Sequence, residues 1–456
     1  MTLSLDGDQF LNLNLINGFE HNYLLDSSSL TKRIVRNGVT VDRKFSAKSA
    51  TPSDLASQWW RSFLDNEDKY ANPLQSLGAR SNREISYIDL FSSVGGLSLG
   101  LEEAVKSFGY RPIPLMAVDV DDGALAIHKH NHGTRRVVHE SVSALVDFKV
   151  LGQGDSATLA YEPTLVGSQM QDLVGKVDVV LAGPPCQGHS TLNNYSRGDD
   201  PRNLLYLTVP AIAIALKAPL VIIENVPNVL NDIDNVVEST KTILSQNGYN
   251  VTGSVLAAHH LGWAQTRKRY FLVATLGYEA VNLDLVSKYF AQQPQSVKWA
   301  LENFKVTTED DDHIMNQIAE MSPVNQTRID WLFDNDAYEL PNHIRPDCHK
   351  DGHTYPSVYG RMKWNEPAPT LTTGFVSPGR GRFIHPVARR VLTPREAARL
   401  QGFPNWFDFS PPVLATSKRG QLAKWIGDAV PSVLGYVAAF AGLIAMPETL
   451  NSRRVG

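Results

Sequence analysis

The 456-residue sequence contains only two cysteines, Cys186 and Cys348. Two cysteines exclude the disulfide framework of a small secreted protein and indicate a reducing, cytoplasmic compartment. The first residues also lack the basic segment and the apolar core of a secretory signal peptide. The longest apolar run, residues 433–446, is shorter than the roughly 18 residues that a membrane span needs, so we expect a buried C-terminal helix there.

A strong excess of charge of one sign is absent as well. The chain has 43 Lys and Arg against 47 Asp and Glu, a formal net charge of −4. No overall positive field therefore attracts nucleic acid, and any such binding requires a local basic surface. A hydrophobic content of 43% and a charged content of 20% are those of an ordinary globular protein, and the length allows two domains with an extra segment.

Cys186 lies in an unusual local sequence. The apolar run at residues 177–181 predicts a short buried strand, and the following GPPCQG segment, residues 183–188, ends any regular structure. Cys186 is therefore expected beyond the carboxyl end of a strand, where open parallel α/β sheets bind their ligands. The alternative is an inert buried cysteine, which a Pro-Pro-Cys-Gln-Gly turn disfavours.

The segment that begins at Ile85 has the pattern of a nucleotide-binding sheet. A strand from Ile85 leads into a tight turn at 92–96 and a helix at 97–108, so a cofactor can approach the backbone at the helix N-terminus. A second strand at 115–118 is followed by Asp119, at a separation that suits a carboxylate binding ribose hydroxyls. Asp119 could instead be the N-cap of the next helix.

A second acidic residue is predicted at the same edge of the sheet. The strand at 220–223 is followed at once by Glu224, and a later strand at 270–275 is preceded by Arg267 and Arg269. Because alternate residues of a strand point to one face, the two arginines are expected on one side. The simpler alternatives are a helix cap for Glu224 and a solvated charge run for the arginines.

Six segments resemble, in the same order, the motifs of the DNA (cytosine-5) methyltransferases of the bacterial C5 type. They are DLFSSVGG at 89–96, GPPCQ at 183–187, ENV at 224–226, QTRKR at 265–269, LTPREAARLQGFP at 392–404 and GDAVP at 427–431. The resemblance spans roughly residues 85–443. It implies an α/β fold, in which a Rossmann-like, S-adenosylmethionine-dependent methyltransferase domain with a mostly parallel sheet is joined by a smaller target-recognition domain, with duplex DNA between them.

The expected division of the chain has four parts. They are an N-terminal extension of unknown role at 1–82, the catalytic methyltransferase domain at 83–276, the target-recognition domain at 277–390, and the hinge motif with a returning C-terminal helix at 391–456. Within the extension, residues 53–70 predict one amphipathic helix with Ser53 as its N-cap. The extension could be regulatory, could contact DNA, or could be a packed arm.

The resemblance assigns the chemistry to four residues. Cys186 would add to C6 of a flipped-out cytosine and so make C5 nucleophilic. Glu224 would donate to N3 and accept from the exocyclic amine, which requires a raised pKa. Arg269 would hold the cytosine O2, and Arg267 would support the loop or the DNA backbone.

The resemblance also implies contacts to the cofactor and to DNA. The residues expected around S-adenosylmethionine are Phe91, Ser92, Gly96, Asp119, Val120, Glu140, Pro185, Leu204, Ala429 and Val430. The residues expected to contact DNA are Gln187, Arg202, Arg361, Arg380 and Arg382, and the last three belong to a basic region with Lys363, Arg389 and Arg390. Ser93 and Asp428 depart from the family pattern, and a serine at a position that needs positive φ would cost strain.

Two other functions remain open at this stage. A tRNA cytosine-5 methyltransferase would use the same chemistry, although the sizeable recognition segment favours DNA. A catalytically silent DNA-binding or scaffold protein is disfavoured because Cys186, Glu224 and both arginines are present. We therefore expect a sequence-specific DNA methyltransferase, monomeric and cytoplasmic, from a restriction-modification system or acting as an orphan modification enzyme. A restriction endonuclease acting on the same site is a further candidate partner.

A metal site is not expected. His343, Cys348, His349 and His353 are potential zinc ligands, but their spacing matches no finger pattern and includes a single thiol. A polar loop of the recognition domain is the preferred interpretation.

Overall fold

The computed structural model describes residues 18–26, 29–46, 54–67, 83–185, 205–302, 304, 313–349, 357–410 and 419–447. Several residues singled out above lie outside these ranges, namely Ser53, Cys186, Gln187, Arg202, Leu204 and His353. The predictions for those residues therefore stay predictions.

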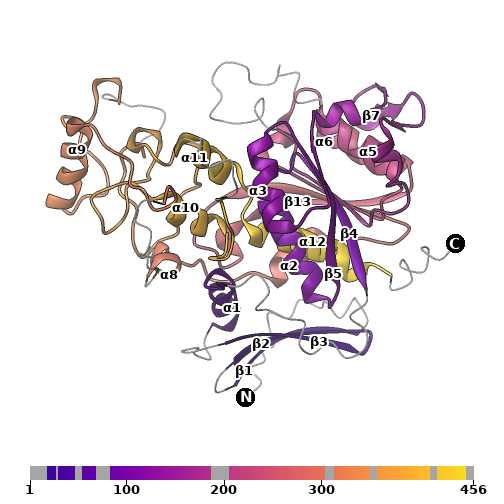
Figure 1. Ribbon diagram of the computed structural model, residues 1–456, viewed down its shortest axis with the longest axis horizontal. Helices are drawn as coiled ribbons and strands as arrows, with labels where there is room; N and C mark the ends of the chain where they lie inside the picture. Colours follow the sequence, from indigo (N-terminus) through magenta and orange to yellow (C-terminus); the bar gives the residue numbers. More distant parts are fainter. Residues whose placement is uncertain are drawn as a thin grey trace.

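A seven-stranded sheet forms the centre of the molecule, in the order β13-β14-β12-β11-β4-β5-β6 (Figure 1). Its strands are β4 (Glu84–Leu90), β5 (Arg111–Asp119), β6 (Arg136–His139), β11 (Val179–Ala182), β12 (Leu220–Asn225), β13 (Tyr249–Ala257) and β14 (Lys268–Leu276). The pairings from β12 to β6 are parallel, and β14 is antiparallel to both of its neighbours. The predicted mostly parallel α/β sheet is confirmed.

The central strands are apolar on both faces because helices cover both faces. In β11, Val179 and Leu181 belong to one apolar cluster, whereas Val180 and Ala182 belong to another. The helices are α2 (Gly96–Ser107), α3 (Asp122–His132) and α12 (Ser432–Ala445) in the first cluster, and α5 (Thr208–Leu216) and α6 (Val236–Gln246) in the second. In β11 and β12 the polar side chains, Glu224 and Asn225, lie only at the carboxyl end of β12.

The C-terminal helix α12 returns to the catalytic domain and packs against α2. A side chain at Gly100 would come within 2.4 Å of the Ser432 carbonyl oxygen, so the two helix backbones approach each other closely. The stretch Arg419–Ala445 is long and apolar enough for a membrane span, but 89% of its most apolar window is buried within the protein. The expectation of a buried C-terminal helix is therefore confirmed.

The N-terminal extension contains a small sheet that its sequence did not predict. Strands β1 (Phe19–Leu25), β2 (Ser29–Arg36) and β3 (Val39–Ser46) form an antiparallel meander at the bottom of Figure 1. Helix α1 (Leu55–Leu64) follows and is shorter than the predicted 53–70, with Asp54 as its N-cap. Its Trp60 packs edge-on against Trp263 and Tyr436, so the extension shares the core of the catalytic domain.

The remaining elements lie around the sheet and in a second lobe at the left of Figure 1. They are β7 (Val146–Asp147), β8 (Val150–Leu151), β9 (Thr158–Leu159), β10 (Thr164–Leu165), α4 (Ser168–Gln171), α7 (Leu283–Tyr289), α8 (Val297–Leu301), α9 (Pro323–Asp334), α10 (Pro394–Gln401) and α11 (Arg419–Asp428). The lobe has its own apolar cluster of Ala319, Ile329, Leu332, Leu340, Ile384 and Val391. By contrast α7, at the start of the predicted recognition range, contributes Leu283 and Val286 to the cluster of the catalytic domain.

A buried ion cluster joins the meander to α2. Lys32 Nζ lies 3.2 Å from Glu103 Oε1, Arg43 contacts the same oxygen, and the Lys32 and Glu103 side chains are 1% and 3% exposed. Burial lowers the pKa of Lys32 to about 7, while burial raises and the two cations lower the pKa of Glu103, with a net decrease. One carboxylate therefore compensates two buried cations.

We expect Glu103→Gln to lower the free energy of unfolding by about 3–5 kcal/mol, because it removes the counter-charge of the buried Arg43 and favours the loss of the Lys32 proton. Denaturant unfolding at pH 7 measures this change. Glu238→Gln is the matched control, since Glu238 and its partner Lys241 are 47% and 35% exposed, and it should change stability by less than about 1 kcal/mol. Equal effects of the two substitutions would contradict a buried, charge-dependent joint.

Candidate active site

Glu224 lies inside β12 at the carboxyl edge of the sheet and is buried. The alternative of a helix cap is therefore wrong. Arg269, in the neighbouring strand β14, places Nε 2.7 Å from Glu224 Oε1. Burial raises the pKa of the Glu224 carboxyl, and the positive charges of Arg269 and Arg267 oppose that rise without cancelling it. The site thus holds a carboxyl group that takes up a proton more readily than a solvated glutamate does.

The described residues just before Cys186 lie next to this carboxyl group. Strand β11 lies between β4 and β12 and leads into Gly183. A Cβ built on Gly183 would lie 3.6 Å from Glu224 Oε2 and 3.9 Å from the Phe91 carbonyl oxygen. The start of the Pro-Pro-Cys segment therefore lies between Glu224 and the turn that follows β4.

Arg267 has surroundings different from those of Arg269. Its side chain is buried and donates to the Leu371 carbonyl oxygen at 2.8 Å and to the Gly427 carbonyl oxygen at 3.1 Å. It therefore joins the start of β14 to the segment before the hinge motif and to the C-terminal motif. The alternative of a solvated charge run is wrong for both arginines, since Arg269 is ion-paired and Arg267 is buried.

The turn after β4 has an unusual backbone. Phe91, Ser93 and Gly95 have φ values of 57°, 46° and 90°, all in the left-handed region. Ser93 therefore carries the strain expected of a non-glycine residue at such a position. Its amide donates to Asp119 Oδ2 at 2.8 Å, a hydrogen bond that offsets part of that cost.

Asp119 is held by backbone amides at the end of β5. Asp119 Oδ1 accepts from the Asp121 amide at 2.9 Å, and burial raises the pKa of Asp119. The N-cap of α3 is Asp121, which accepts from the Ala124 amide, so the proposed cap role of Asp119 is wrong. Next to it, Val120 is 69% exposed and Glu140 is also exposed, its amide donating to the Asp119 carbonyl oxygen.

The C-terminal motif closes on the same turn. A Cβ on Gly96 would come within 2.8 Å of the Val430 carbonyl oxygen and 3.2 Å of Ala429 Cβ. Ser92 Oγ is buried with no hydrogen-bond partner among the described residues. A free hydroxyl, a carboxylate on backbone amides and an exposed apolar side chain fit the amino acid, ribose and adenine parts of S-adenosylmethionine.

Two histidines of α3, which were not predicted as site residues, pack against the turn that follows β4. His128 Nε2 lies 3.3 Å from Asp89 Oδ2, and His132 Nδ1 lies 3.0 Å from Glu102 Oε1. A side chain on Gly95 would meet His132 Nε2 at 2.2 Å. Both lie on one face of α3 because they are four residues apart. The helix expected from the sequence ends at residue 130, before His132, so this shared face was not predicted.

Most of the predicted basic region is paired internally. Arg361 Nε donates to the Pro386 carbonyl oxygen at 2.8 Å, and its guanidinium lies 4.1 Å from the Phe333 ring centre. Arg382 donates to the Tyr338 carbonyl oxygen and pairs with Glu339. Arg389 pairs with Asp330 and Asp334, and Arg390 pairs with Glu396. Arg380 is exposed, and its side chain has no such bond within the described part of the chain.

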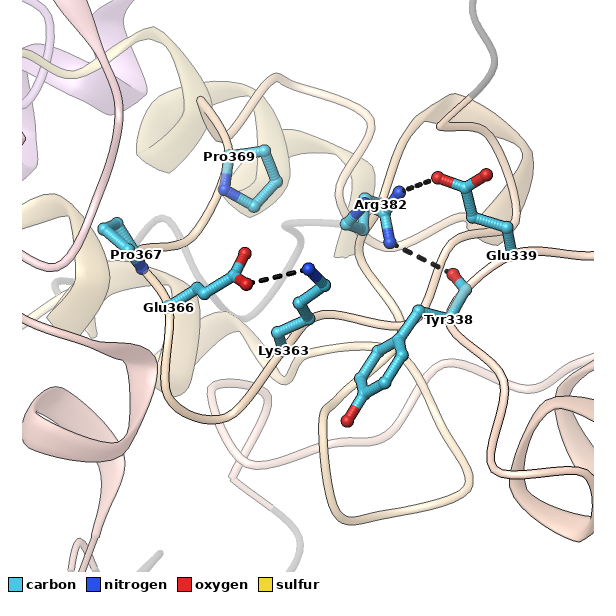
Figure 2. A pocket seen from close by; sticks show the side chains of 7 residues that line it. All are labelled: Tyr338, Glu339, Lys363, Glu366, Pro367, Pro369 and Arg382. Atoms are coloured by element: carbon cyan, nitrogen blue, oxygen red, sulfur yellow. Dashed lines mark hydrogen bonds and ion pairs between the residues drawn. The ribbon is translucent and has the colours of Figure 1, made fainter.

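A groove of about 480 Å³ lies on the same lobe (Figure 2). Its lining residues are Tyr338, Glu339, Lys363, Glu366, Pro367, Pro369 and Arg382. Lys363 and Glu366 point toward one another, with Nζ 2.7 Å from Oε1, and their side chains are 46% and 58% exposed. The groove therefore presents both hydrogen-bond donors and acceptors.

Across the described ranges, no cluster of three or more His, Cys, Asp or Glu side chains could hold a metal ion.

Comparison with known proteins identifies this arrangement. The family model for C-5 cytosine-specific DNA methylases matches residues 85–439. The chain belongs to that family. It is a DNA (cytosine-5)-methyltransferase, and its methyl donor is S-adenosylmethionine.

Curated relatives and solved structures agree with the family. The type II methyltransferase M1.BsuMI of Bacillus subtilis is 36% identical over 92% of this chain and 94% of its own length. The type II methylase M.HgiDII of Herpetosiphon aurantiacus is 30% identical over 77% and 93%. A putative prophage DNA modification methyltransferase from E. coli matches with a TM-score of 0.51 and 24% identity, covering 79% of this chain and 98% of that one. The last of these likenesses concerns the fold alone.

We expect Arg269→Gln to raise the pKa of the Glu224 carboxyl further, because a nearby positive charge favours the ionised form. A pH titration by 13C NMR of protein labelled at the glutamate carboxyl carbons measures the shift. Lys268→Gln is the control, since the adjacent Lys268 is exposed and is not among the groups that shift Glu224. An unchanged Glu224 titration in Arg269→Gln would show that the ion pair does not set this pKa.

Proposed function

We propose that the enzyme methylates C5 of a flipped-out cytosine within one short sequence of duplex DNA and that Cys186 forms the covalent adduct. The observation that carries this proposal is the buried Glu224 carboxyl, which lies beside Arg269 and next to the start of the loop bearing Cys186. Cytosine C5 is a poor nucleophile until a thiolate adds to C6. Covalent catalysis of this kind replaces one difficult step by easier ones.

Glu224 and Arg269 act together on the pyrimidine ring. When the Cys186 thiolate forms the C6–S bond, the displaced electron pair moves to N3, and Glu224 donates a proton there. The raised pKa of Glu224 favours the protonated form that such a donor requires. When Arg269 turns toward the cytosine O2, Glu224 loses part of its counter-charge, which raises its pKa at the moment a donor is needed.

Product formation restores the cysteine. Bound S-adenosylmethionine would supply an electrophilic methyl group to C5, with S-adenosylhomocysteine as the leaving group. A solvent base then removes the C5 proton, the C5–C6 double bond reforms, and the sulfur leaves as the Cys186 thiolate. The N3 proton returns to Glu224, which restores the carboxyl group for the next turnover. Arg267, fixed on the carbonyl oxygens of Leu371 and Gly427, maintains the spacing between β14 and the C-terminal motif during these steps.

The turn around residues 91–96 forms the floor of the proposed cofactor site. Ser92 would bind the amino acid part, Asp119 the ribose hydroxyls, and Val120 and Glu140 the adenine. Phe91, Gly96, Pro185, Leu204, Ala429 and Val430 would complete the walls. The support for this assignment is the contact of Gly96 with residues 429–430 and the buried, unpaired Ser92 hydroxyl.

We propose that DNA lies between the carboxyl edge of the sheet, which carries Glu224, and the second lobe. We also propose that the domain boundaries lie at residues 82, 276 and 390. Arg380 is the arginine of the lobe best suited to a phosphate, because it is exposed. Arg361 and Arg382 would shape the groove and reach DNA only by exchanging their internal bonds. Gln187 and Arg202 would contact DNA from the Cys186 loop.

The biological setting is proposed from the relatives. Two of them carry the designation type II, which is used for methylases of restriction-modification systems. The relatives' names support placing the enzyme in that group. We further propose that it is a cytoplasmic monomer and that it protects a site also cut by a cognate endonuclease.

The central prediction concerns the adduct. DNA with 5-fluorocytosine at the target should trap the enzyme in a complex that survives denaturation, because fluorine cannot leave C5 as a proton does. Trapping should require S-adenosylmethionine. Cys186→Ala should abolish both trapping and methylation, and Cys348→Ala, which changes the other cysteine, should leave both intact. An adduct mapped to Cys348, or full activity of Cys186→Ala, would refute the proposal.

A second prediction concerns substrate and proton donor. Methyl transfer to duplex DNA should exceed transfer to tRNA, and methylome sequencing of a host that expresses the chain should reveal one recurrent site. Glu224→Gln should slow methylation by about 10²–10⁴-fold, the usual cost of losing a general acid. Preferential methylation of tRNA would instead support the RNA-modifying alternative.

A further inference from the structure

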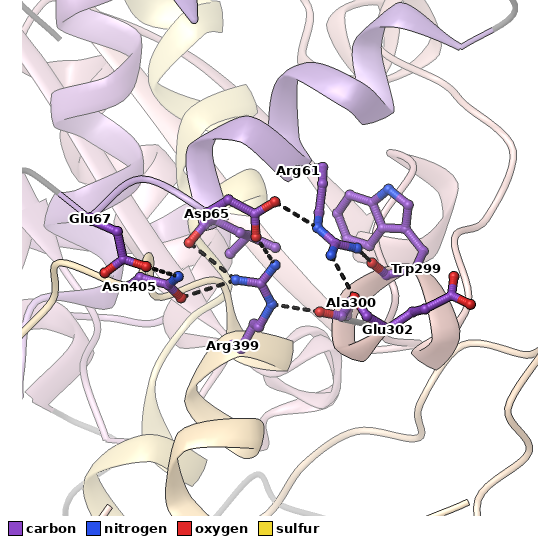
Figure 3. Close-up of polar contacts among 9 residues, drawn as sticks. Arg61, Asp65, Glu67, Trp299, Ala300, Glu302, Arg399 and Asn405 are labelled. Atoms are coloured by element: carbon purple, nitrogen blue, oxygen red, sulfur yellow. Dashed lines mark hydrogen bonds and ion pairs between the residues drawn. The ribbon is translucent and has the colours of Figure 1, made fainter. Parts of the chain in front are cut away.

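The end of helix α1 is bonded to two segments that are distant in sequence (Figure 3). The Asp65 carboxylate accepts from Arg61 Nε at 2.9 Å and also pairs with Arg399 of α10. The side chain of Arg399 is 1% exposed, and its other donors contact the carbonyl oxygens of Ala300 and Leu64 and the Asn405 side chain. Asp65 is thus the only negatively charged side chain paired with this buried guanidinium in the described part of the chain.

The same two arginines cap helix α8. Arg61 donates to the carbonyl oxygens of Trp299 and Glu302, and Arg399 donates to that of Ala300. The last carbonyl groups of a helix have no partner within the helix, and cations are favoured there. Arg61 and Arg399, held side by side by Asp65, therefore fix the position of the C-terminus of α8.

The N-terminus of α8 is hydrogen-bonded to the segment that lines the groove of Figure 2. The Val297 amide donates to the Glu366 carbonyl oxygen at 2.9 Å, and the Lys298 amide donates to the Trp364 carbonyl oxygen at 2.8 Å. These acceptors belong to the segment that supplies Lys363, Glu366, Pro367 and Pro369 to the groove. One short helix thus joins the end of α1 to the groove wall.

The segment that lines the groove is hydrogen-bonded in turn to the residues just before β14. The Ala368 amide donates to the Ala264 carbonyl oxygen, and the Thr266 amide donates to the Ala368 carbonyl oxygen, both at 2.8 Å. Through α10, Gln401 accepts from Gln265 at 3.0 Å and donates to the Ala429 carbonyl oxygen at 3.2 Å. The positions of α8 and α10 therefore affect the position of the groove, of the start of β14 and of Ala429 in the proposed cofactor site.

We propose that Asp65, together with Arg61 and Arg399, is a positioning element of the methyltransferase. Through α8 and α10 it sets the recognition groove relative to Glu224 and Arg269, so the N-terminal extension takes part in the choice of target. This inference rests on the proposed function, since it requires that the groove reads DNA.

The test compares Asp65→Ala with wild type in steady-state kinetics. The fluorocytosine trap counts the active sites, so that all rates are expressed per active enzyme. We expect the KM for DNA to rise, and the preference for the target over sites that differ by one base pair to fall, each by about tenfold, because neighbouring groups in one bonded network are energetically coupled. The KM for S-adenosylmethionine should change less.

Two further variants separate positioning from simple stability. Asp65→Glu keeps the charge and should restore most of the discrimination. Arg61→Gln, at a side chain that is 25% exposed, should lower it in the same direction even if Asp65→Ala folds poorly. Glu238→Ala removes a carboxylate on α6, which is not bonded to Asp65, Arg61 or Arg399. It should leave the discrimination between target and near-target DNA sites at the wild-type value.

The outcomes are distinct. If Asp65→Ala and Arg61→Gln only lower the melting temperature or the active fraction, with the KM for DNA and the discrimination per active site unchanged, the inference is wrong and the contact is merely structural. If wild type itself forms no trapped complex and methylates no DNA, the proposed function fails instead.

Discussion

Burial of the central strands on both faces is the constraint on which the rest of the molecule depends. Because β11 and β12 are covered by helices on each side, their polar side chains can be accommodated only where the strands end. Glu224 is at such an end, and Gly183 follows the neighbouring one. The sheet thereby brings the Glu224 carboxyl group and Gly183, three residues before Cys186, together although they are distant in the sequence.

Burial also gives the Glu224 carboxyl its chemistry. Desolvation favours its neutral form, and Arg269 favours its charged form, so the balance depends on where the guanidinium lies. A base that takes Arg269 as its hydrogen-bond donor would change that balance in the direction that acid catalysis requires. The proton donor and the substrate-binding group are in this way parts of one ion pair.

Helix α10 is bonded to several separate parts of the enzyme. Arg399 faces α1 and α8, and Gln401 faces Gln265 and the C-terminal motif. A helix of eight residues thus contacts the N-terminal extension, the segment just before β14 and the C-terminal motif. The N-terminal extension is part of this framework, because Trp59, Trp60 and Leu64 are buried in the core of the catalytic domain.

The sequence by itself predicted five of the seven strands of the sheet, the order of its motifs and the placement of Glu224 and Asp119 at the strand ends, because strand periodicity and Gly-Pro breaks are local signals. It did not predict the edge strands β6 and β13. It did not determine the meander at residues 19–46, whose strands owe their stability to packing on α2 and α12. Only the tertiary structure separated Arg267 from Arg269, since their sequence spacing is compatible with either environment. Only it showed that Arg361 and Arg382 are bonded within the lobe whereas Arg380 is exposed, because the partners of a surface cation come from segments distant along the chain.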